Sequence, residues 1–212
     1  MRYWLMHLIR GVTVFLALCA LGGARMLADD WPQARPITMF TEAADRFVRI
    51  VPGRSIGDLV GFSGASKGPY ATAEIFVRQP DRSYRFTRAA TLVNPVAPVN
   101  ALLAPDGAFA TFDNWHNRGY GKVVAIYRAD GTPITSYTLE DLYRGRDLTK
   151  VPTSVSSRTW LCAPLFVMSE GTEAYAREFL GGEFVFSLRD GSFRYVPGTV
   201  KECVVPQPQW DR

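Results

Sequence analysis

Residues 123–137 read Val123-Val124-Ala125-Ile126-Tyr127-Arg128-Ala129-Asp130-Gly131-Thr132-Pro133-Ile134-Thr135-Ser136-Tyr137. An unbroken apolar run comes first, an Asp-Gly pair follows, and a mixed run of polar and apolar residues ends the stretch. Asp-Gly favours the tight turn of a β-hairpin, because such turns need residues with positive φ. The stretch therefore predicts two antiparallel strands that are joined at 130–131.

The same arrangement recurs on both sides of this stretch. A second Asp-Gly pair, 190–191, follows the apolar run 183–189 and precedes the alternating run 192–196. Upstream, the apolar run 74–78 leads through 79–82 into the alternating run 83–87. A continuous apolar run between turn signals predicts a strand that is buried on both faces. An alternating run predicts a strand with one buried and one wetter face.

These hairpins predict an all-β chain. A third Asp-Gly pair, Asp106-Gly107, joins 99–104 to 108–112, and 45–51 reads as a strand that ends at Pro52-Gly53. We expect one β domain over 45–204, with antiparallel blade-like units at about 45–92, 99–139 and 155–196. Closed propellers usually have about 4 to 8 blades, so three units predict a partial, propeller-like arrangement.

One short helix is predicted near 139–144. Thr138 is a suitable N-cap for Leu139-Glu140-Asp141-Leu142-Tyr143, whose acidic residues lie in the first turn. The cations that follow, Arg144, Arg146 and Lys150, form a basic patch that we interpret as a solvated face.

The stretch Leu103-Ala104-Pro105-Asp106-Gly107-Ala108-Phe109 resembles the Ser-Pro-Asp-Gly strand turn of WD40-, TolB- and YVTN-type propeller blades, with Ala104 in place of the serine. Residues 104–142 also resemble a group of exported bacterial proteins of unknown function with propeller-type repeats. The resemblance covers about 40 residues and implies a fold type and an extracytoplasmic location. It implies no activity, because blades of this kind carry many unrelated functions.

The N-terminus is predicted to be a secretory signal peptide over 1–24. Arg2 and Arg10 precede a mostly apolar stretch, 11–24, that ends in small residues and is shorter than the roughly 20 residues of a membrane-spanning helix. Cleavage after Ala24 and cleavage after Ala28 both fit, and an uncleaved single-span anchor is the open alternative. The expected location is periplasmic or secreted, with membrane attachment only if this segment is retained.

The remaining chain carries little net charge and two cysteines. Without residues 1–24, Lys+Arg falls from 24 to 22 against 20 acidic residues. This near-neutral chain has no stripe of Lys and Arg interleaved with aromatic residues, so we do not expect nucleic-acid binding. Cys162 and Cys203 then have only each other as partners in an oxidising compartment, which predicts a disulfide. Residues 25–44 are expected to be a linker or a first strand, and 205–212 a flexible tail.

The strongest candidate for a binding site is the loop 113–121, which joins two predicted strands. Loops held by a rigid sheet often carry binding residues. Trp115 and Tyr120 offer stacking surface, and His116 is the single histidine after residue 24. The proposed contact residues are Asp113, Asn114, Trp115, His116, Asn117 and Tyr120. The alternative is structural: the polar residues cap a turn and Trp115 packs on the sheet.

Chemical roles for this loop find little support in the sequence. A metal held by Asp113, Asn114 and Asn117 would have one carboxylate ligand, fewer than a hard cation prefers. Nucleophilic catalysis needs a nucleophile, a base and an orienting group, and Gly61-Phe62-Ser63-Gly64 lacks the spacing of a nucleophile elbow. We therefore assign no catalytic residue, no metal ligand and no cofactor.

The sequence favours an exported, noncatalytic binding or scaffolding module that contacts an unknown protein or an envelope component through the loop 113–121. Two alternatives remain open at this point. One is a hydrolase that acts on an envelope substrate, and the other is a structural β protein that self-associates as a homodimer.

Overall fold

The computed structural model describes residues 31–167, 171–198 and 202–204. The chain divides into two compact units, residues 1–32 and 33–212, and all of the described strands belong to the second unit. The predicted signal peptide at 1–24 and the predicted tail at 205–212 lie outside the described residues. The segment predicted as linker or first strand, 25–44, contains the strand Ile37–Phe40.

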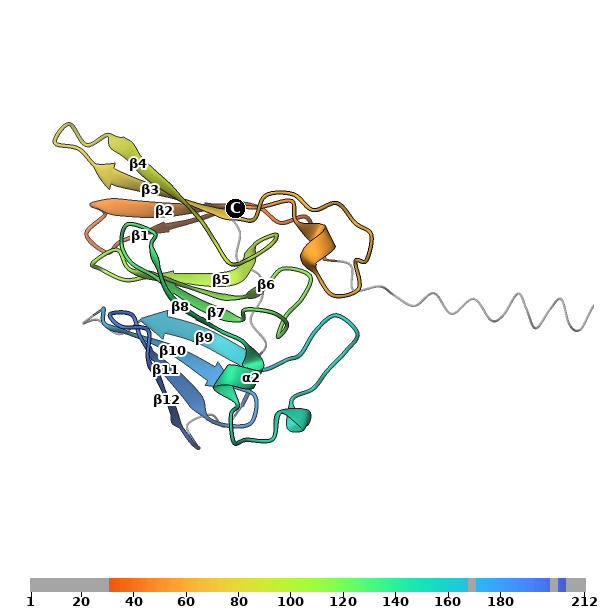
Figure 1. Ribbon diagram of the computed structural model, residues 1–212. Helices are drawn as coiled ribbons and strands as arrows, with labels where there is room; N and C mark the ends of the chain where they lie inside the picture. Colours follow the sequence, from red (N-terminus) through yellow and green to blue (C-terminus); the bar gives the residue numbers. More distant parts are fainter. Residues whose placement is uncertain (1–30, 168–170, 199–201, 205–212) are drawn as a thin grey trace, which may run out of the picture. The chain divides into compact units, whose positions relative to one another are not determined.

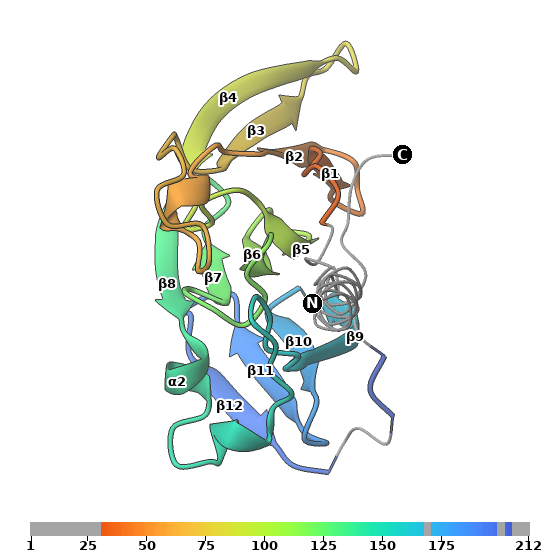
Figure 2. The same cartoon turned by 90° about the vertical axis from the view of Figure 1, so that its right-hand side faces the viewer.

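The fold is all-β, as predicted. The described residues form twelve strands in three four-stranded antiparallel sheets, each with its strands in chain order (Figures 1 and 2). The first sheet contains β1 (Ile37–Phe40), β2 (Arg46–Val51), β3 (Thr72–Arg78) and β4 (Tyr84–Thr91). The second contains β5 (Pro98–Leu103), β6 (Phe109–Asn114), β7 (Val124–Tyr127) and β8 (Pro133–Tyr137). The third contains β9 (Leu161–Val167), β10 (Glu173–Glu178), β11 (Glu183–Ser187) and β12 (Phe193–Val196).

The three predicted Asp-Gly turns are all present, between β5 and β6, β7 and β8, and β11 and β12. Gly107, Gly131 and Gly191 have φ values of 90°, 81° and 80°, which a residue with a side chain rarely adopts. In each turn the aspartate Oδ1 accepts a hydrogen bond from the backbone N–H two residues on, at 2.8 to 2.9 Å. These local bonds explain why Asp-Gly pairs fix the turns.

Two apolar layers hold the three sheets together. One layer contains Ile50 and Ile75 of the first sheet with Phe109 and Tyr127 of the second. The other joins the opposite face of the second sheet to Phe184, Phe186 and other residues of the third. The second sheet is therefore buried on both faces, which explains the unbroken apolar sequence of β7.

The prediction of two buried faces is wrong for the run 74–78. Along β3, Ala73 and Ile75 are buried while Phe76 is half-exposed. Because the first sheet packs against the second on one face only, its other face has no sheet to cover it in the described residues. The apolar character of this strand thus does not come from burial on both sides.

The predicted short helix is α2 (Leu139–Leu142). Thr138 Oγ1 accepts a hydrogen bond from the Asp141 N–H at 3.2 Å, and Asp141 Oδ2 accepts one from the Thr138 N–H at 2.9 Å. This reciprocal pair is a capping box, and it satisfies two backbone donors that the helix itself leaves free. Leu139 and Leu142 anchor the turn in the core.

Replacement of Thr138 by alanine should lower the free energy of unfolding by about 1 kcal/mol, because the Asp141 N–H loses the hydroxyl that accepts its hydrogen bond. Thr138→Ser retains the hydroxyl and should keep most of the stability. Urea unfolding of the two variants beside the wild type measures the difference. Equal stability of the alanine and serine variants would rule out a stabilising role for the cap.

The predicted disulfide is confirmed. Cys162 on β9 is bonded to Cys203, with their Cα atoms 5.0 Å apart and 41 residues of separation along the chain. Next to it, Ala163 and Val204 form an isolated antiparallel bridge. The disulfide and the bridge together hold residues 202–204 beside β9, an edge strand of the third sheet.

Candidate functional site

The loop 113–121 leaves the end of β6 through a sharply turned backbone. Asp113 and His116 have positive φ values of 59° and 68°, and Gly119 and Gly121 have 73° and 67°. Positive φ is uncommon for residues other than glycine and asparagine, so surrounding bonds must hold the two non-glycine residues in place. The hydrogen bonds of the polar side chains show how this is achieved.

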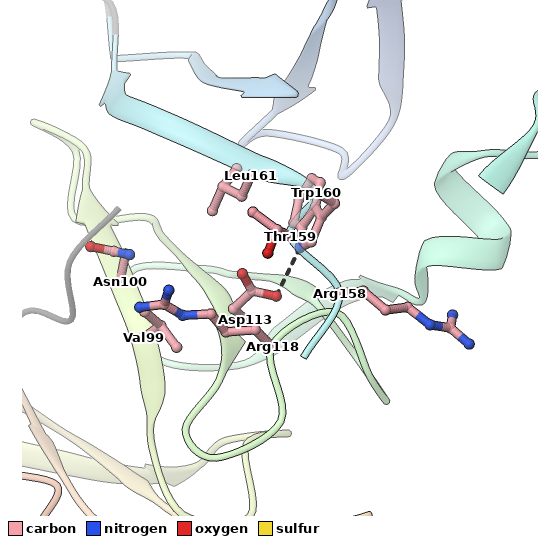
Figure 3. A pocket seen from close by; sticks show the side chains of 8 residues that line it. All are labelled: Val99, Asn100, Asp113, Arg118, Arg158, Thr159, Trp160 and Leu161. Atoms are coloured by element: carbon pink, nitrogen blue, oxygen red, sulfur yellow. Dashed lines mark hydrogen bonds between the residues drawn. The ribbon is translucent and has the colours of Figure 1, made fainter. Parts of the chain in front are cut away.

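Asp113 is buried between the second and third sheets. Its Oδ1 accepts a hydrogen bond from the Trp160 Nε1–H (Figure 3) and another from the Gly119 N–H, both at 2.8 Å. Burial raises the pKa of Asp113 to about 6, and the bonds from Trp160 and Gly119 oppose this shift. A neighbouring cavity of about 10 Å³ is lined by Asp113, Asn100 and Arg118. It has room for about one water molecule and none for an organic ligand.

Asn114 closes the loop from inside. Its Nδ2 donates hydrogen bonds to the carbonyl oxygens of Tyr120 and Lys122, at 2.7 and 3.0 Å. Its Oδ1 accepts a hydrogen bond from Asn94 Nδ2 at 2.8 Å. One buried amide thus joins both ends of the loop to the segment that follows β4.

Asn117 connects the loop to a distant segment. Its Oδ1 accepts a hydrogen bond from the Val60 N–H at 2.5 Å, and its Nδ2 donates to the Val60 carbonyl at 3.2 Å. The side chain therefore bonds to the backbone of residue 60 as a neighbouring strand would. This segment includes the short 3-10 turn Ile56–Asp58.

The remaining predicted residues differ in exposure. Trp115 is only 1% exposed, whereas His116 and Tyr120 are half-buried. Burial lowers the pKa of His116, whose ring lies 5.5 Å from that of Phe62. The Arg158 guanidinium lies over the Tyr120 ring, 4.6 Å from its centroid.

The six predicted residues therefore separate into two groups. The Oδ1 atoms of Asp113, Asn114 and Asn117 each accept a hydrogen bond from an N–H group of the chain. Among the described residues there is no group of three or more His, Cys, Asp or Glu side chains placed to hold a metal ion. His116 and Tyr120 are the two that solvent reaches appreciably.

A cleft lies between the loop and the segment near residue 60. Its volume is about 280 Å³. Tyr120 and Lys122 line it from the loop side, and Val60 and Tyr70 line it from the other. Asn114 and Asn117 form part of its floor, and their hydrogen bonds tie the two sides together. The cleft is the concave surface that the predicted loop contributes to.

The partners of the loop are residues that sequence reasoning missed. Asn94, Val60 and Trp160 bond to loop side chains across 20, 57 and 47 residues of chain. No local sequence pattern indicates these pairs, because each partner taken by itself is typical of a turn, a linker or a core position. The polar density of the loop was the one available signal.

A second buried carboxylate, Glu178, was also missed. It is 0% exposed and accepts hydrogen bonds from the hydroxyls of Tyr143 and Tyr195, both at 2.7 Å. Arg146 Nη1 lies 3.8 Å from its Oε1, and the Arg146 guanidinium lies 3.6 Å from the centroid of the Tyr195 ring. The interpretation of Arg146 as part of a solvated basic patch is therefore wrong.

Comparisons with protein-family models and with curated proteins found no match for this chain. Within the described residues, no helix combines the length and the apolar sequence needed to cross a lipid bilayer.

Proposed function

We propose that the chain is an exported, noncatalytic binding or scaffolding module that contacts its partner at the cleft beside the loop 113–121. The observation that carries the proposal is the cleft itself, about 280 Å³ in volume and bordered by Tyr120, Lys122 and Tyr70. Ligand and peptide sites in proteins are concave and mostly preformed. The three packed sheets act as a rigid support for this surface.

Preorganisation supports a binding role. The floor of the cleft is fixed by the buried amides of Asn114 and Asn117, which together make bonds to three separate segments of the chain. A surface that is already ordered loses little conformational entropy when a partner binds. Tyr120 supplies an aromatic ring of the kind that dominates the energy of many interfaces.

The noncatalytic form of the proposal rests on the chemistry of the loop. Asp113 is buried and accepts hydrogen bonds from Trp160 and Gly119. Its carboxylate therefore stabilises the loop, and it does not line the cleft as a catalytic base would. His116 has Phe62 as its ring neighbour. Export is supported by the bond between Cys162 and Cys203, since structural disulfides form and persist in oxidising compartments.

Affinity capture with the full chain as bait tests the cleft. We expect Tyr120→Ala to reduce the recovery of the captured envelope component about tenfold, which is the loss typical of one aromatic contact residue. Tyr120→Phe retains the ring and should retain most of the recovery. Quantitative mass spectrometry of the captured material gives the ratio.

Tyr175 provides a matched control, because it is a half-buried tyrosine on the third sheet. Tyr175→Ala should leave the recovery unchanged. If Tyr120→Ala and Tyr175→Ala recover the same component equally well, the cleft is not the contact surface.

A further inference from the structure

The outer face of the first sheet, which points away from the second sheet, carries a row of aromatic side chains. Phe40, Phe47, Phe76 and Phe86 are direct cross-strand neighbours on β1, β2, β3 and β4. Successive ring centroids lie 5.1, 4.4 and 5.6 Å apart. Tyr84 lies 4.9 Å from Phe47. These five residues are the aromatic row.

The aromatic row is open to solvent. Phe40 is 54% exposed and Phe86 is 51% exposed. The neighbours Val48 and Ile75 point the other way, into the apolar layer against the second sheet. Aromatic side chains gathered on one exposed face mark a surface that binds another molecule.

Arg49, Glu74 and Arg78 are the charged residues at the outward-facing positions of β2 and β3. Arg49 and Glu74 are cross-strand partners in the register next to the aromatic row, and their charged groups lie 3.9 Å apart. Thr38 continues the same register on β1. The face therefore offers one positive and one negative group side by side.

The outer face of the third sheet is built differently. Its outward-facing side is crossed by two ion pairs, Arg177 with Glu183 and Arg194 with Glu173. Val185, which alternates with the core residues of β11, is only 1% exposed. Stacked repeats end in a polar outer face when no partner follows. By this criterion the third sheet is a capped end and the first sheet is not.

We propose that the outer face of the first sheet is the interface of a two-fold symmetric dimer, in which two copies of the chain pack aromatic row against aromatic row. A two-fold axis that runs along the strands between β2 and β3 places Arg49 of one copy opposite Glu74 of the second copy, twice. The same operation places Phe47 opposite Phe76. The operation thus sets opposite charges and aromatic rings against each other, as the self-complementary surface of a two-fold interface requires.

The capped third sheet argues against the head-to-tail arrangement. That arrangement would bury the ion pairs of the third sheet against an apolar row, and desolvating ion pairs is costly. The face spans four strands and about six residues, roughly 19 by 20 Å. This is roughly 400 Å² per copy, less than a stable specific interface buries, which argues for a weak association. We expect a reversible dimer with a dissociation constant on the order of 10 µM. This inference does not rest on the proposed function of the cleft.

Sedimentation velocity of the full chain, expressed with its own N-terminal segment, tests the dimer over a range of concentrations. Phe86→Ser should raise the dissociation constant at least about tenfold, because an exposed aromatic contact is lost. Val155→Ser removes an apolar side chain that is 86% exposed elsewhere and should leave the constant unchanged. Near-ultraviolet circular dichroism confirms that each variant is folded.

A charge exchange identifies the symmetry. Glu74→Arg places like charges opposite each other across the axis and should weaken the dimer at least about tenfold. The double variant Arg49→Glu/Glu74→Arg restores opposite charges and should return the constant to within about threefold of the wild type. Arg194→Glu, on the third sheet, should have no effect.

The proposal is overturned by a chain that remains monomeric at every concentration, or by a dimer that Phe86→Ser leaves intact. It is also overturned if Arg194→Glu dissociates the dimer, since the third sheet would then take part in the contact. Failure of the double variant to restore a dimer that Glu74→Arg has weakened would exclude a two-fold axis between β2 and β3.

Discussion

Asp113→Ala should lower the free energy of unfolding by about 3 kcal/mol at pH 5, which is among the largest effects expected of any single substitution in this chain. At this pH the native side chain is largely neutral, because its pKa is raised to about 6. The alanine variant loses two hydrogen bonds and leaves the buried Trp160 N–H without its acceptor. Chemical unfolding at pH 5 measures the loss.

Asp113 also makes stability depend on pH. Its pKa is about 6 in the folded chain, against 3.8 for an ordinary aspartate, so between these values the folded chain binds more protons than the unfolded one. Its contribution is therefore fully present below about pH 4 and is lost as the pH rises to about 6. The free energy of unfolding changes by roughly 3 kcal/mol through this titration, and the contribution of Asp113 no longer varies above about pH 7.

Asp113→Asn is the matched control, because it keeps an Oδ1 acceptor and removes the ionisation. Subtracting the stability of this variant from that of the wild type at each pH cancels the opposite contributions of other carboxylates, such as Glu173, whose pKa is lowered to about 2 by Arg194 and Tyr175. The difference should fall between pH 4 and 6. A difference that rises or stays level over this range would show that Asp113 titrates normally.

Glu178→Ala should destabilise the chain by about 4 kcal/mol, because it removes the shared acceptor of a buried network. Four donors bond to this carboxylate: the hydroxyls of Tyr143 and Tyr195 and the N–H groups of Leu180 and Gly182. Arg146, whose side chain is 24% exposed, would also lose the negative charge beside it. Urea unfolding at pH 7 measures the effect.

Two further variants separate the causes. Glu178→Gln keeps one carbonyl oxygen and should lose about half as much stability as the alanine variant. Glu140 pairs with Arg158 at 2.7 Å but is 63% exposed, so Glu140→Ala should cost less than about 1 kcal/mol. Similar losses for Glu178→Ala and Glu140→Ala would mean that burial does not strengthen the network.

Much of the fold was predictable because its decisive signals are local. Each Asp-Gly turn is fixed by bonds within a few residues, as Ala108 N–H to Asp106 shows, and Thr138 and Asp141 cap α2 across three residues. Strand 123–127 was correctly predicted to be buried on both faces. The identical argument failed for 74–78, because the composition of a strand does not reveal whether a further sheet covers it.

The sequence predicted where the candidate site lies along the chain, but not which of its side chains are buried. The loop 113–121 was recognised by its polar and aromatic density, and that it binds a partner stays a prediction. Which of its residues are buried depends on Trp160, Asn94 and Val60, all far away in the sequence.

The sequence by itself determined the antiparallel hairpins, their turns, the capped helix and the pairing of Cys162 with Cys203. The hairpins, turns and helix cap follow from the backbone preferences of residues that are close in sequence. The cysteine pairing follows because only two cysteines remain after residue 24. Only the tertiary structure decided that Asp113 and Glu178 are buried, that the third sheet ends in ion pairs, and that Phe40 and Phe86 face solvent. The physical reason is that burial is a property of which sheets stack together, and stacking joins residues that no short-range pattern connects.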